Sequence, residues 1–318
     1  MRNNVGVVIA TYNGERYIEE QLNSIINQSI RPDIVVISDG GSNDNTVSIC
    51  EKILQEDGIK HLILTSKKQL SVKINFERAI SACDAEYIFC ADQDDYWLKD
   101  KIFDFLSIFR KNNPDMVFSN AFIVDENLNK TGTKLWETIG YNSQKEMEVY
   151  EKGSIEFRKL LYKHNVVTGM CMAFRGDLKD EVLPFSNNAI HDVWLAFKIN
   201  QLGKVIALNK CEVLYRQHKN NVIGTHSSLQ NSFMHKNGYY SRIIQRIDFI
   251  KDVSGDCDNK LEQLDKQYIA HLQWRKEFVE GTKGIKNIFQ KLGAYKQYEY
   301  KWFLILLKDI YTRWNPKK

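Results

Sequence analysis

The sequence predicts an α/β protein in which a mostly parallel sheet carries helices on both faces and is followed by a helical C-terminal extension. Over the first 120 residues, short apolar runs alternate with segments whose apolar residues recur at helical spacing. This alternation is typical of right-handed crossovers that pack helices on a parallel sheet. After about residue 227 the strand pattern stops and helical patterns continue. We therefore expect two domains, at residues 1–226 and 227–318.

The strands expected in the first half are short apolar runs of the kind that a parallel sheet buries on both faces. They lie at residues 5–10, 34–37, 61–64, 87–91 and 116–118. The segments between the strands each have one apolar face, which predicts amphipathic helices. These helices are expected around residues 18–26, 47–54, 76–80 and 102–109.

Residues 127–153 are polar and show no clear period, so we expect a long loop there, and loops of this length are often functional. Beyond this loop the pattern again predicts alternating helices and strands. The helices are expected near 155–163 and 191–202, and the strands near 170–175, 204–208 and 211–216. A break between Gly281 and Gly284 is expected to divide the C-terminal helices.

The composition excludes several classes of protein. The 318 residues carry 44 Lys and Arg against 40 Asp and Glu, and a net charge of +4 is too small to indicate a nucleic-acid partner. The six cysteines include no CxxC pair, which indicates buried thiols in a reducing compartment rather than a zinc ribbon or a thioredoxin motif. Neither a signal peptide nor a membrane-spanning run is recognised, so we expect a cytoplasmic protein.

Three polar clusters follow directly after predicted strands. They are Thr11–Glu15, Ser38–Ser42 and Asp92–Asp95. Each cluster alone is compatible with an ordinary turn. The carboxyl ends of parallel strands lie at one edge of the sheet, where ligands of α/β proteins bind. Together the clusters therefore indicate a binding site at that edge.

The aspartates of the third cluster are the strongest of these signals. Asp92, Asp94 and Asp95 are close enough to repel one another and to require a counter-charge. A divalent cation with oxygen ligands would supply this charge and could hold a diphosphate. The alternative is a solvated turn in which Asp94 or Asp95 caps the next helix. A phosphate-binding P-loop and a GxGxxG dinucleotide motif are both absent.

Two further motifs lie beyond residue 190. Asp192 opens a predicted helix, where an aspartate serves either as an N-cap or as a functional carboxylate. Arg216 and His218 follow a predicted strand and lie on one side of it if the chain stays extended. These side chains suit a phosphate and a metal ion, although a surface turn would also contain such residues.

The five motifs, in their order and separations, resemble those of the inverting family 2 glycosyltransferases with a GT-A fold. The resemblance covers roughly the first 225 residues. The last three motifs are most similar in form to the corresponding motifs of bacterial rhamnosyltransferases of surface polysaccharide assembly. The segments concerned are Val8–Gly14, Ser38–Thr46, Ala91–Trp97, His191–Trp194 and Tyr215–His218.

The resemblance implies a role for each site residue. Asp39 would accept a hydrogen bond from the nucleotide base, and Asp92 would face the ribose or the sugar. Asp94 would bind a divalent metal, Mn²⁺ or Mg²⁺, with His218 as a further ligand, whereas Asp95 is a weaker candidate. The other residues implied in nucleotide binding are Thr11, Tyr12, Asn13 and Glu15.

The resemblance also implies a mechanism and a substrate class. Asp192 would be the general base, and Arg216 would stabilise the diphosphate leaving group. The donor would be a nucleotide-diphosphate sugar, with dTDP-rhamnose the first candidate and a UDP-sugar the second, and the acceptor a saccharide or lipid-linked saccharide. The sequence departs from the family in having His191 where a glutamate is usual. It also lacks the Gln-x-x-Arg-Trp motif of processive members, which favours a non-processive enzyme.

The C-terminal segment from Tyr295 to Trp314 combines aromatic, aliphatic and basic residues. This pattern suits peripheral attachment to the inner face of the cell membrane, and equally a core helix or a homodimer interface. Two other functions remain open from the sequence. One is a nucleotidyltransferase, which the lack of a basic Gly-rich loop after the first strand disfavours. The other is an inactive sugar-nucleotide-binding or scaffold subunit, which the presence of Asp92, Asp94 and Asp192 disfavours.

Overall fold

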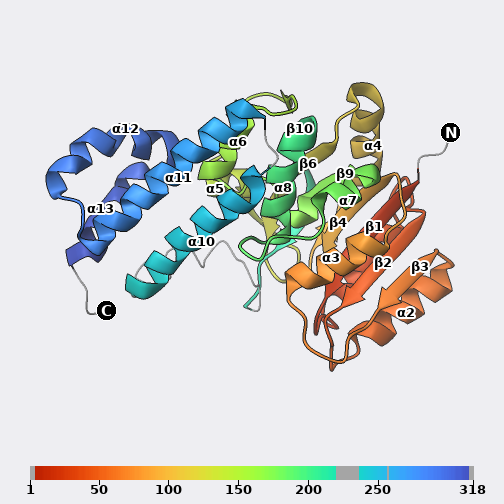
Figure 1. Cartoon of the computed structure of the whole chain (residues 1–318). Helices are drawn as coiled ribbons and strands as arrows, with labels where there is room; N and C mark the ends of the chain where they lie inside the picture. Colours follow the sequence, from red (N-terminus) through yellow and green to blue (C-terminus); the bar gives the residue numbers. More distant parts are fainter. Residues whose placement is uncertain (1–3, 220–235, 256–257, 315–318) are drawn as a thin grey trace.

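The computed structural model describes residues 4–219, 236–255 and 258–314. It contains one mixed sheet with helices on both faces, and Figure 1 shows the C-terminal helices beside this sheet, on the side of α6 and α8. The α/β architecture and the helical C-terminal region agree with the sequence-based expectation. The expected domain boundary at residues 226 and 227 lies outside the described residues.

The N-terminal half of the sheet is parallel, in the order β3-β2-β1-β4. Its register places Thr11 opposite Asp39 and Ala10 opposite Asp92. The polar clusters that follow these strands are therefore brought to one edge of the sheet, as expected. The strands are β1 (Val5–Thr11), β2 (Ile34–Asp39), β3 (His61–Leu64) and β4 (Tyr87–Asp92).

The second half of the sheet is mixed. β6 and β10 are parallel to each other, while β9 is antiparallel to both β4 and β6, and β5 is antiparallel to β10. β10 is one strand where the sequence predicts two, because Asn209 and Lys210 bulge out of register with β6. The strands are β5 (Tyr96–Trp97), β6 (Met116–Val124), β9 (Met172–Arg175) and β10 (Val205–Arg216).

The expectation of a long loop at residues 127–153 was wrong. This segment contains β7 (Lys130–Lys134), paired with β6, then α5 (Leu135–Ile139), and β8 (Met147–Tyr150), paired with β10. Trp136 anchors it, because its ring is buried and lies edge-on to Phe118 at 5.7 Å. Isolated anchors of this kind produce no period in the sequence.

Helices cover the two faces of the sheet with separate apolar cores. α1 (Ile18–Ile26), α2 (Thr46–Asp57) and α4 (Lys101–Asn112) bury their apolar residues in one core. The other core also takes up residues of the C-terminal helices, so those helices are continuous with the sheet. On that face lie α3 (Val72–Ala82), α6 (Ile155–Lys163) and α8 (His191–Leu202), with the short helix α7 (Lys179–Val182).

The described residues of the C-terminal region form helices joined by short connections. α11 ends at Glu280, where Gly281 adopts φ +95° as a left-handed cap, so the break expected from Gly281 is present. None of the helices within residues 4–219, 236–255 and 258–314 is long and apolar enough to cross a bilayer. The helices are α10 (Lys236–Ser254), α11 (Asn259–Glu280), α12 (Ile288–Tyr298) and α13 (Trp302–Trp314).

A buried charge network joins the C-terminal helices. The Arg275 guanidinium on α11 donates to Asp309 on α13 at 2.9 Å and to Glu299 at 2.5 Å. The hydroxyls of Tyr239 and Tyr295 also donate to Asp309, whose side chain is fully buried. The network therefore ties α10, α11, α12 and α13 to one carboxylate.

We expect Asp309→Ala to lower the free energy of unfolding by about 3–5 kcal/mol, because it leaves the Arg275 guanidinium buried without its main partner. Urea unfolding followed by circular dichroism measures this loss. Asp248→Ala is the control, since among the residues that the structure describes Asp248 forms only an exposed pair with Lys251, and its loss should cost less than about 1 kcal/mol. Equal stabilities of the two variants would contradict this role of Asp309.

Candidate active site

The loops that follow β1 and β2 are joined by side-chain hydrogen bonds. The Asn13 amide N–H donates to Ser42 Oγ at 2.8 Å, and the Asn43 amide N–H donates to Asn13 Oδ1 at 2.9 Å. Glu15 accepts hydrogen bonds from the backbone and the side chain of Asn45, both at 3.0 Å. Asn13 and Glu15, which the sequence predicts to bind a nucleotide, therefore form one wall with the second loop.

Asp39 organises the same wall from beneath. Its carboxylate accepts hydrogen bonds from Thr11 Oγ1 at 2.8 Å and from the amide N–H groups of Gly41 and Ser42 at 3.0 and 2.8 Å. The residue is 1% exposed. In this structure Asp39 therefore fixes the loop, and a contact with a nucleotide base stays a prediction.

Gln93 connects the β1 loop to the acidic loop after β4. Its Oε1 accepts from the Tyr12 amide N–H at 2.9 Å, and its Nε2 donates to the Tyr12 carbonyl at 3.2 Å. The loops approach so closely that a Cβ on Gly14 would lie 2.3 Å from Gln93 Oε1. The sequence reasoning assigned Gln93 no role, because a long-range contact with a backbone leaves no local pattern.

Three carboxyl groups crowd the end of β4. Burial, together with the charges of Asp94 and Asp192, raises the pKa of Asp92 to about 7. Burial and the charges of Asp94 and Asp92 also raise the pKa of Asp95 well above its usual value. Asp95 Oδ1 accepts from the Arg216 amide N–H at 3.0 Å, while its buried Oδ2 has no hydrogen-bond partner among the described residues. This end of the strand therefore needs positive charge.

Lys101 supplies one positive charge from below. Its side chain is fully buried, donates to the Met170 carbonyl at 2.6 Å and lies 3.5 Å from the centre of the Trp97 ring. Burial lowers the pKa of this amine to about 8, although nearby anionic groups including Asp95 oppose the shift. The sequence reasoning did not single out Lys101, because nothing local indicates that a lysine just before the helix expected at 102–109 is buried beside the aspartates.

Asp94 and His218 meet on the open side of the cluster. Asp94 Oδ2 lies 2.9 Å from His218 Nε2, and the imidazole packs at 4.7 Å against the ring of Tyr17. Adjacent ligands of an octahedral divalent ion are about 3 Å apart when each lies about 2.1 Å from it, so this spacing and donor set fit one ion. Within the described residues, no group of three His, Cys, Asp or Glu side chains is arranged to hold a metal.

Arg216 is buried beneath the acidic loop. Its guanidinium donates to the Asp94 carbonyl at 2.8 Å, to the Glu126 carbonyl at 2.6 Å and to Glu20 Oε2 at 2.6 Å. It also lies 4.6 Å from the centre of the Tyr17 ring. These contacts position the backbone of Asp94, and a contact with a leaving diphosphate stays a prediction.

Asp192 lies at the start of α8 and is almost fully buried. One carboxylate oxygen accepts from the Val193 amide N–H at 2.7 Å, and the other accepts from Asn165 Nδ2 at 3.2 Å. Its charge contributes to the raised pKa of Asp92, so the structure brings Asp192 near the β4 cluster. Asn165 was not singled out in the sequence, where nothing marks it as a partner of Asp192.

His191, the departure from the resembled family, faces the core rather than the acidic cluster. Its ring stacks on Phe76 at 3.8 Å, and burial lowers the pKa of the imidazole. A Cβ on Gly169 would lie 2.5 Å from His191 Nε2. His191 therefore packs the start of α8 against Gly169 and orients the neighbouring Asp192.

The geometry defines a class of protein in which two hydrogen-bonded loops, an acidic cluster and a separate carboxylate lie near the carboxyl ends of the parallel strands of an α/β sheet. Residues 6–182 match the model of Glycosyl transferase family 2. The dTDP-rhamnosyl transferase RfbG of Shigella flexneri is 30% identical over 282 residues, which cover 83% of this chain and 90% of the relative. The chain belongs to glycosyl transferase family 2 and is a glycosyltransferase.

More distant relatives and solved structures agree with this family. A chondroitin synthase of Escherichia coli is 25% identical over 208 residues, covering 65% of this chain and 28% of that enzyme. Residues 1–349 of Staphylococcus aureus TarS in complex with UDP-GlcNAc superimpose with a TM-score of 0.60 at 17% identity, covering 93% of this chain and 80% of that one.

The mannosyltransferase PcManGT of Pyrobaculum calidifontis, solved with GDP-Man and Mn²⁺, gives a TM-score of 0.52 at 15% identity, covering 98% of this chain and 85% of that one. The expectations of a GT-A fold and of a glycosyltransferase are thereby confirmed.

Proposed function

We propose that this glycosyltransferase is inverting and non-processive, and that it moves one sugar from a nucleotide-diphosphate donor to a hydroxyl of a saccharide acceptor. The observation that carries the proposal is the placement of Asp192 near Asp92, at the same edge of the sheet as the Asp94–His218 pair. A general base on one side of the sugar and an anchored diphosphate on the other are the requirements of a single displacement.

The donor pocket in this proposal is the wall formed by the loops after β1 and β2. Thr11, Tyr12, Asn13 and Glu15 line it, with Asp39 toward the base and Asp92 toward the ribose or sugar. The likeness to a dTDP-rhamnosyl transferase supports dTDP-rhamnose as the first candidate donor. The UDP-GlcNAc complex of TarS supports a UDP-sugar as the second.

The residues of this chain divide the chemistry between them. Asp192 takes the proton of the acceptor hydroxyl while that oxygen attacks the anomeric carbon from the face opposite the diphosphate, so the configuration inverts. Asp94 and His218 would hold a divalent ion, Mn²⁺ or Mg²⁺, which would neutralise charge on the diphosphate. Arg216 holds the Asp94 loop and would add positive charge near the leaving group.

Asp192→Asn should abolish transfer to the acceptor but leave binding of the nucleotide sugar unchanged, because the amide keeps the shape of the carboxylate and cannot accept the proton. Transfer is measured by product formation, and donor binding by isothermal titration calorimetry. Asp177→Asn is the control, since within the described part of the chain Asp177 accepts side-chain hydrogen bonds only from Arg175, away from the cluster. A fully active Asp192→Asn variant would refute the assignment of the base.

Asp94→Ala should weaken donor binding in the presence of Mn²⁺ and leave binding without metal little changed, because only the metal-dependent part needs this carboxylate. The measurement is the thermal shift produced by dTDP-rhamnose and UDP-sugars, with and without metal, since a ligand of the folded state raises the melting temperature. An equal metal-dependent shift in wild type and variant would count against Asp94. If the wild type binds a nucleotide sugar but does not hydrolyse it, the result would favour the alternative of an inactive sugar-nucleotide-binding subunit.

The proposal extends to the division of the chain into a catalytic domain at residues 1–226 and a helical region at residues 227–318. In the helical region, α13 presents an apolar face to solvent, with Phe303 55%, Leu304 58% and Trp314 65% exposed. Lys301 is exposed just before this helix, whereas Lys308 is half-buried and Arg313 donates to the carbonyls of Phe278 and Lys283. Exposed aromatic and aliphatic residues beside a basic residue suit a surface of anionic lipid, which would place the enzyme at the inner face of the cell membrane beside a lipid-linked acceptor.

The protein should co-sediment with vesicles that contain phosphatidylglycerol and bind less to phosphatidylcholine vesicles. Replacing both Phe303 and Leu304 by Ser should reduce this binding, because it removes buried apolar area from the lipid contact. Leu62→Ser is the control, since Leu62 is exposed on β3 at the other end of the molecule. No vesicle binding, together with a dimer that the double substitution dissociates, would instead assign this face to a homodimer.

A further inference from the structure

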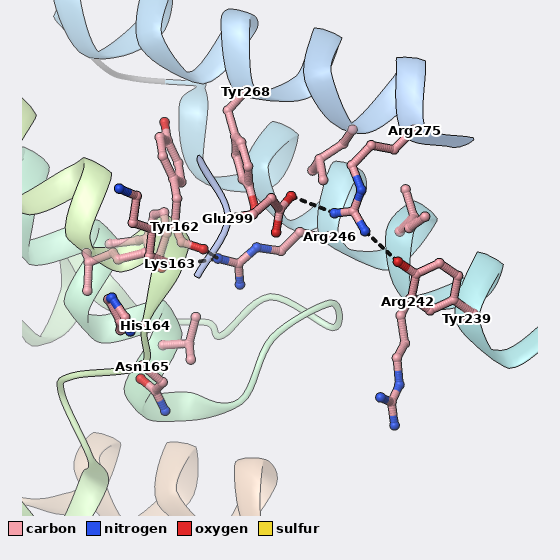
Figure 2. Close-up of a pocket in the computed structure, with 15 residues that line it drawn as sticks. Tyr162, Lys163, His164, Asn165, Tyr239, Arg242, Arg246, Tyr268, Arg275 and Glu299 are labelled. Atoms are coloured by element: carbon pink, nitrogen blue, oxygen red, sulfur yellow. Dashed lines mark hydrogen bonds and ion pairs between the residues drawn. The ribbon is translucent and has the colours of Figure 1, made fainter. Parts of the chain in front are cut away.

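A cavity of about 310 Å³ lies between α6 and α8 on one side and α10 and α11 on the other. Its volume is at the small end of the range for small-molecule sites. Figure 2 shows its lining, with Asn165 at one end and Arg275 and Tyr239 toward the other. None of the donor-site residues described above lines it. The cavity is therefore separate from the donor pocket.

The cavity begins beside the proposed base. Asn165, which lines it, donates through Nδ2 to Asp192 at 3.2 Å, and Val193, the next residue after Asp192, also lines it. The Asn165 Oδ1 atom is buried and has no hydrogen-bond partner within the described residues. A hydroxyl group that approaches Asp192 from the cavity would find this free acceptor next to the carboxylate.

The walls carry more positive than negative charge. Among the lining residues, Arg275 is committed to Asp309 and Glu299. Arg246 instead donates to the carbonyls of Leu161 and Tyr162, at 3.1 and 3.3 Å. In Figure 2 its guanidinium reaches from α10 across the cavity. The Arg246 guanidinium also interacts with the Tyr268 side chain and with the charge of Glu299, so it is held in place by groups from several walls.

Arg242 lies one turn before Arg246 on α10. Its side chain forms no hydrogen bond or ion pair with any residue that the structure describes. The same is true of the Lys163 side chain, which lines the opposite wall. Glu299 is the only carboxylate among the described lining residues, and it accepts a hydrogen bond from Arg275 and interacts with the charge of Arg246. The lining thus carries three arginines and Lys163 against one carboxylate, and such an excess of positive charge suits a phosphate or a carboxylate.

Aromatic rings complete the lining. Tyr162 and Tyr268 stack with their ring centres 4.0 Å apart, and the Arg246 guanidinium lies 5.9 Å from the Tyr268 ring and 5.8 Å from that of Phe197. Rings that are packed in this way hold the guanidinium in place at low entropic cost. They also provide apolar faces for the C–H surfaces of a sugar.

We propose that this cavity is the acceptor subsite, and that it takes a saccharide whose anionic group is bound by Arg242 and Arg246 while its hydroxyl reaches Asp192 beside Asn165. The inference rests on the proposed function, because it assumes that Asp192 is the base. The anionic group is either the diphosphate of a lipid-linked saccharide or the carboxylate of an acidic sugar.

Isothermal titration calorimetry on the full chain tests the subsite with two probes, geranyl diphosphate and glucuronic acid. The donor site is first saturated with dTDP or UDP and Mn²⁺, so that neither probe can bind there. At least one probe should bind. Arg242→Ala and Arg246→Ala should each weaken that binding by about tenfold or more, as expected for a charge-assisted hydrogen bond. Binding of geranyl diphosphate identifies a lipid carrier, and binding of glucuronic acid an acidic sugar.

Arg110→Ala is the matched control, because Arg110 is an exposed arginine in the last turn of α4 and should leave probe binding unchanged. Arg242 is exposed and unpaired among the described residues, so its variant tests the subsite even if Arg246→Ala is unstable. Binding of neither probe, or equal binding by wild type and both arginine variants, overturns the subsite. The Kd of the nucleotide is also measured for the wild type and for each variant. A wild type that binds no nucleotide would contradict the proposed function rather than the subsite.

Discussion

The crowding of carboxyl groups at the end of β4 is the constraint on which the rest of the site depends. Asp92, Asp94 and Asp95 are held together at the end of a strand that is buried along most of its length, and burial together with the neighbouring charges raises the pKa of Asp92 and of Asp95. The fold meets this constraint with a buried amine, that of Lys101, and with the backbone and side chain of Arg216. The carboxylates still need further positive charge on the open side of the cluster, where Asp94 lies beside His218.

The C-terminal helices pack against the helices that cover one face of the sheet. Their apolar residues belong to the same core as α3, α6 and α8, so the start of α8, which carries Asp192, is packed from both directions. The network around Asp309 fixes α10 and α11, whose arginines line the cavity that leads toward Asp192. A donor site built by the sheet and an acceptor site built by helices would then meet at a single carboxylate.

Much of the fold could be predicted from the sequence because buried parallel strands are continuous apolar runs. The strands that carry the site, β1, β2 and β4, fall where these runs predict them. The segment at residues 127–153 could not be predicted, because its short strands depend on pairing with β6 and β10 rather than on their own pattern.

Some residues of the candidate site could likewise be predicted from the sequence, and others could not. Asp94 and His218 stand out in the sequence because each follows a predicted strand, and Asp192 because it opens a predicted helix; Asp94 lies beside His218, and the charge of Asp192 acts on Asp92 at the end of the same strand. Gln93 and Asn165 do not stand out, because each acts through a contact with a residue far away in the chain.

The most direct test of this account is the position of a metal ion in crystals grown with Mn²⁺ and dTDP or UDP, located by anomalous diffraction at the manganese edge. The account predicts a single strong peak in contact with Asp94 Oδ2 and His218 Nε2, with the nucleotide lying along the loops after β1 and β2. A nucleotide bound at these loops with the manganese elsewhere, or with no manganese at all, would contradict it.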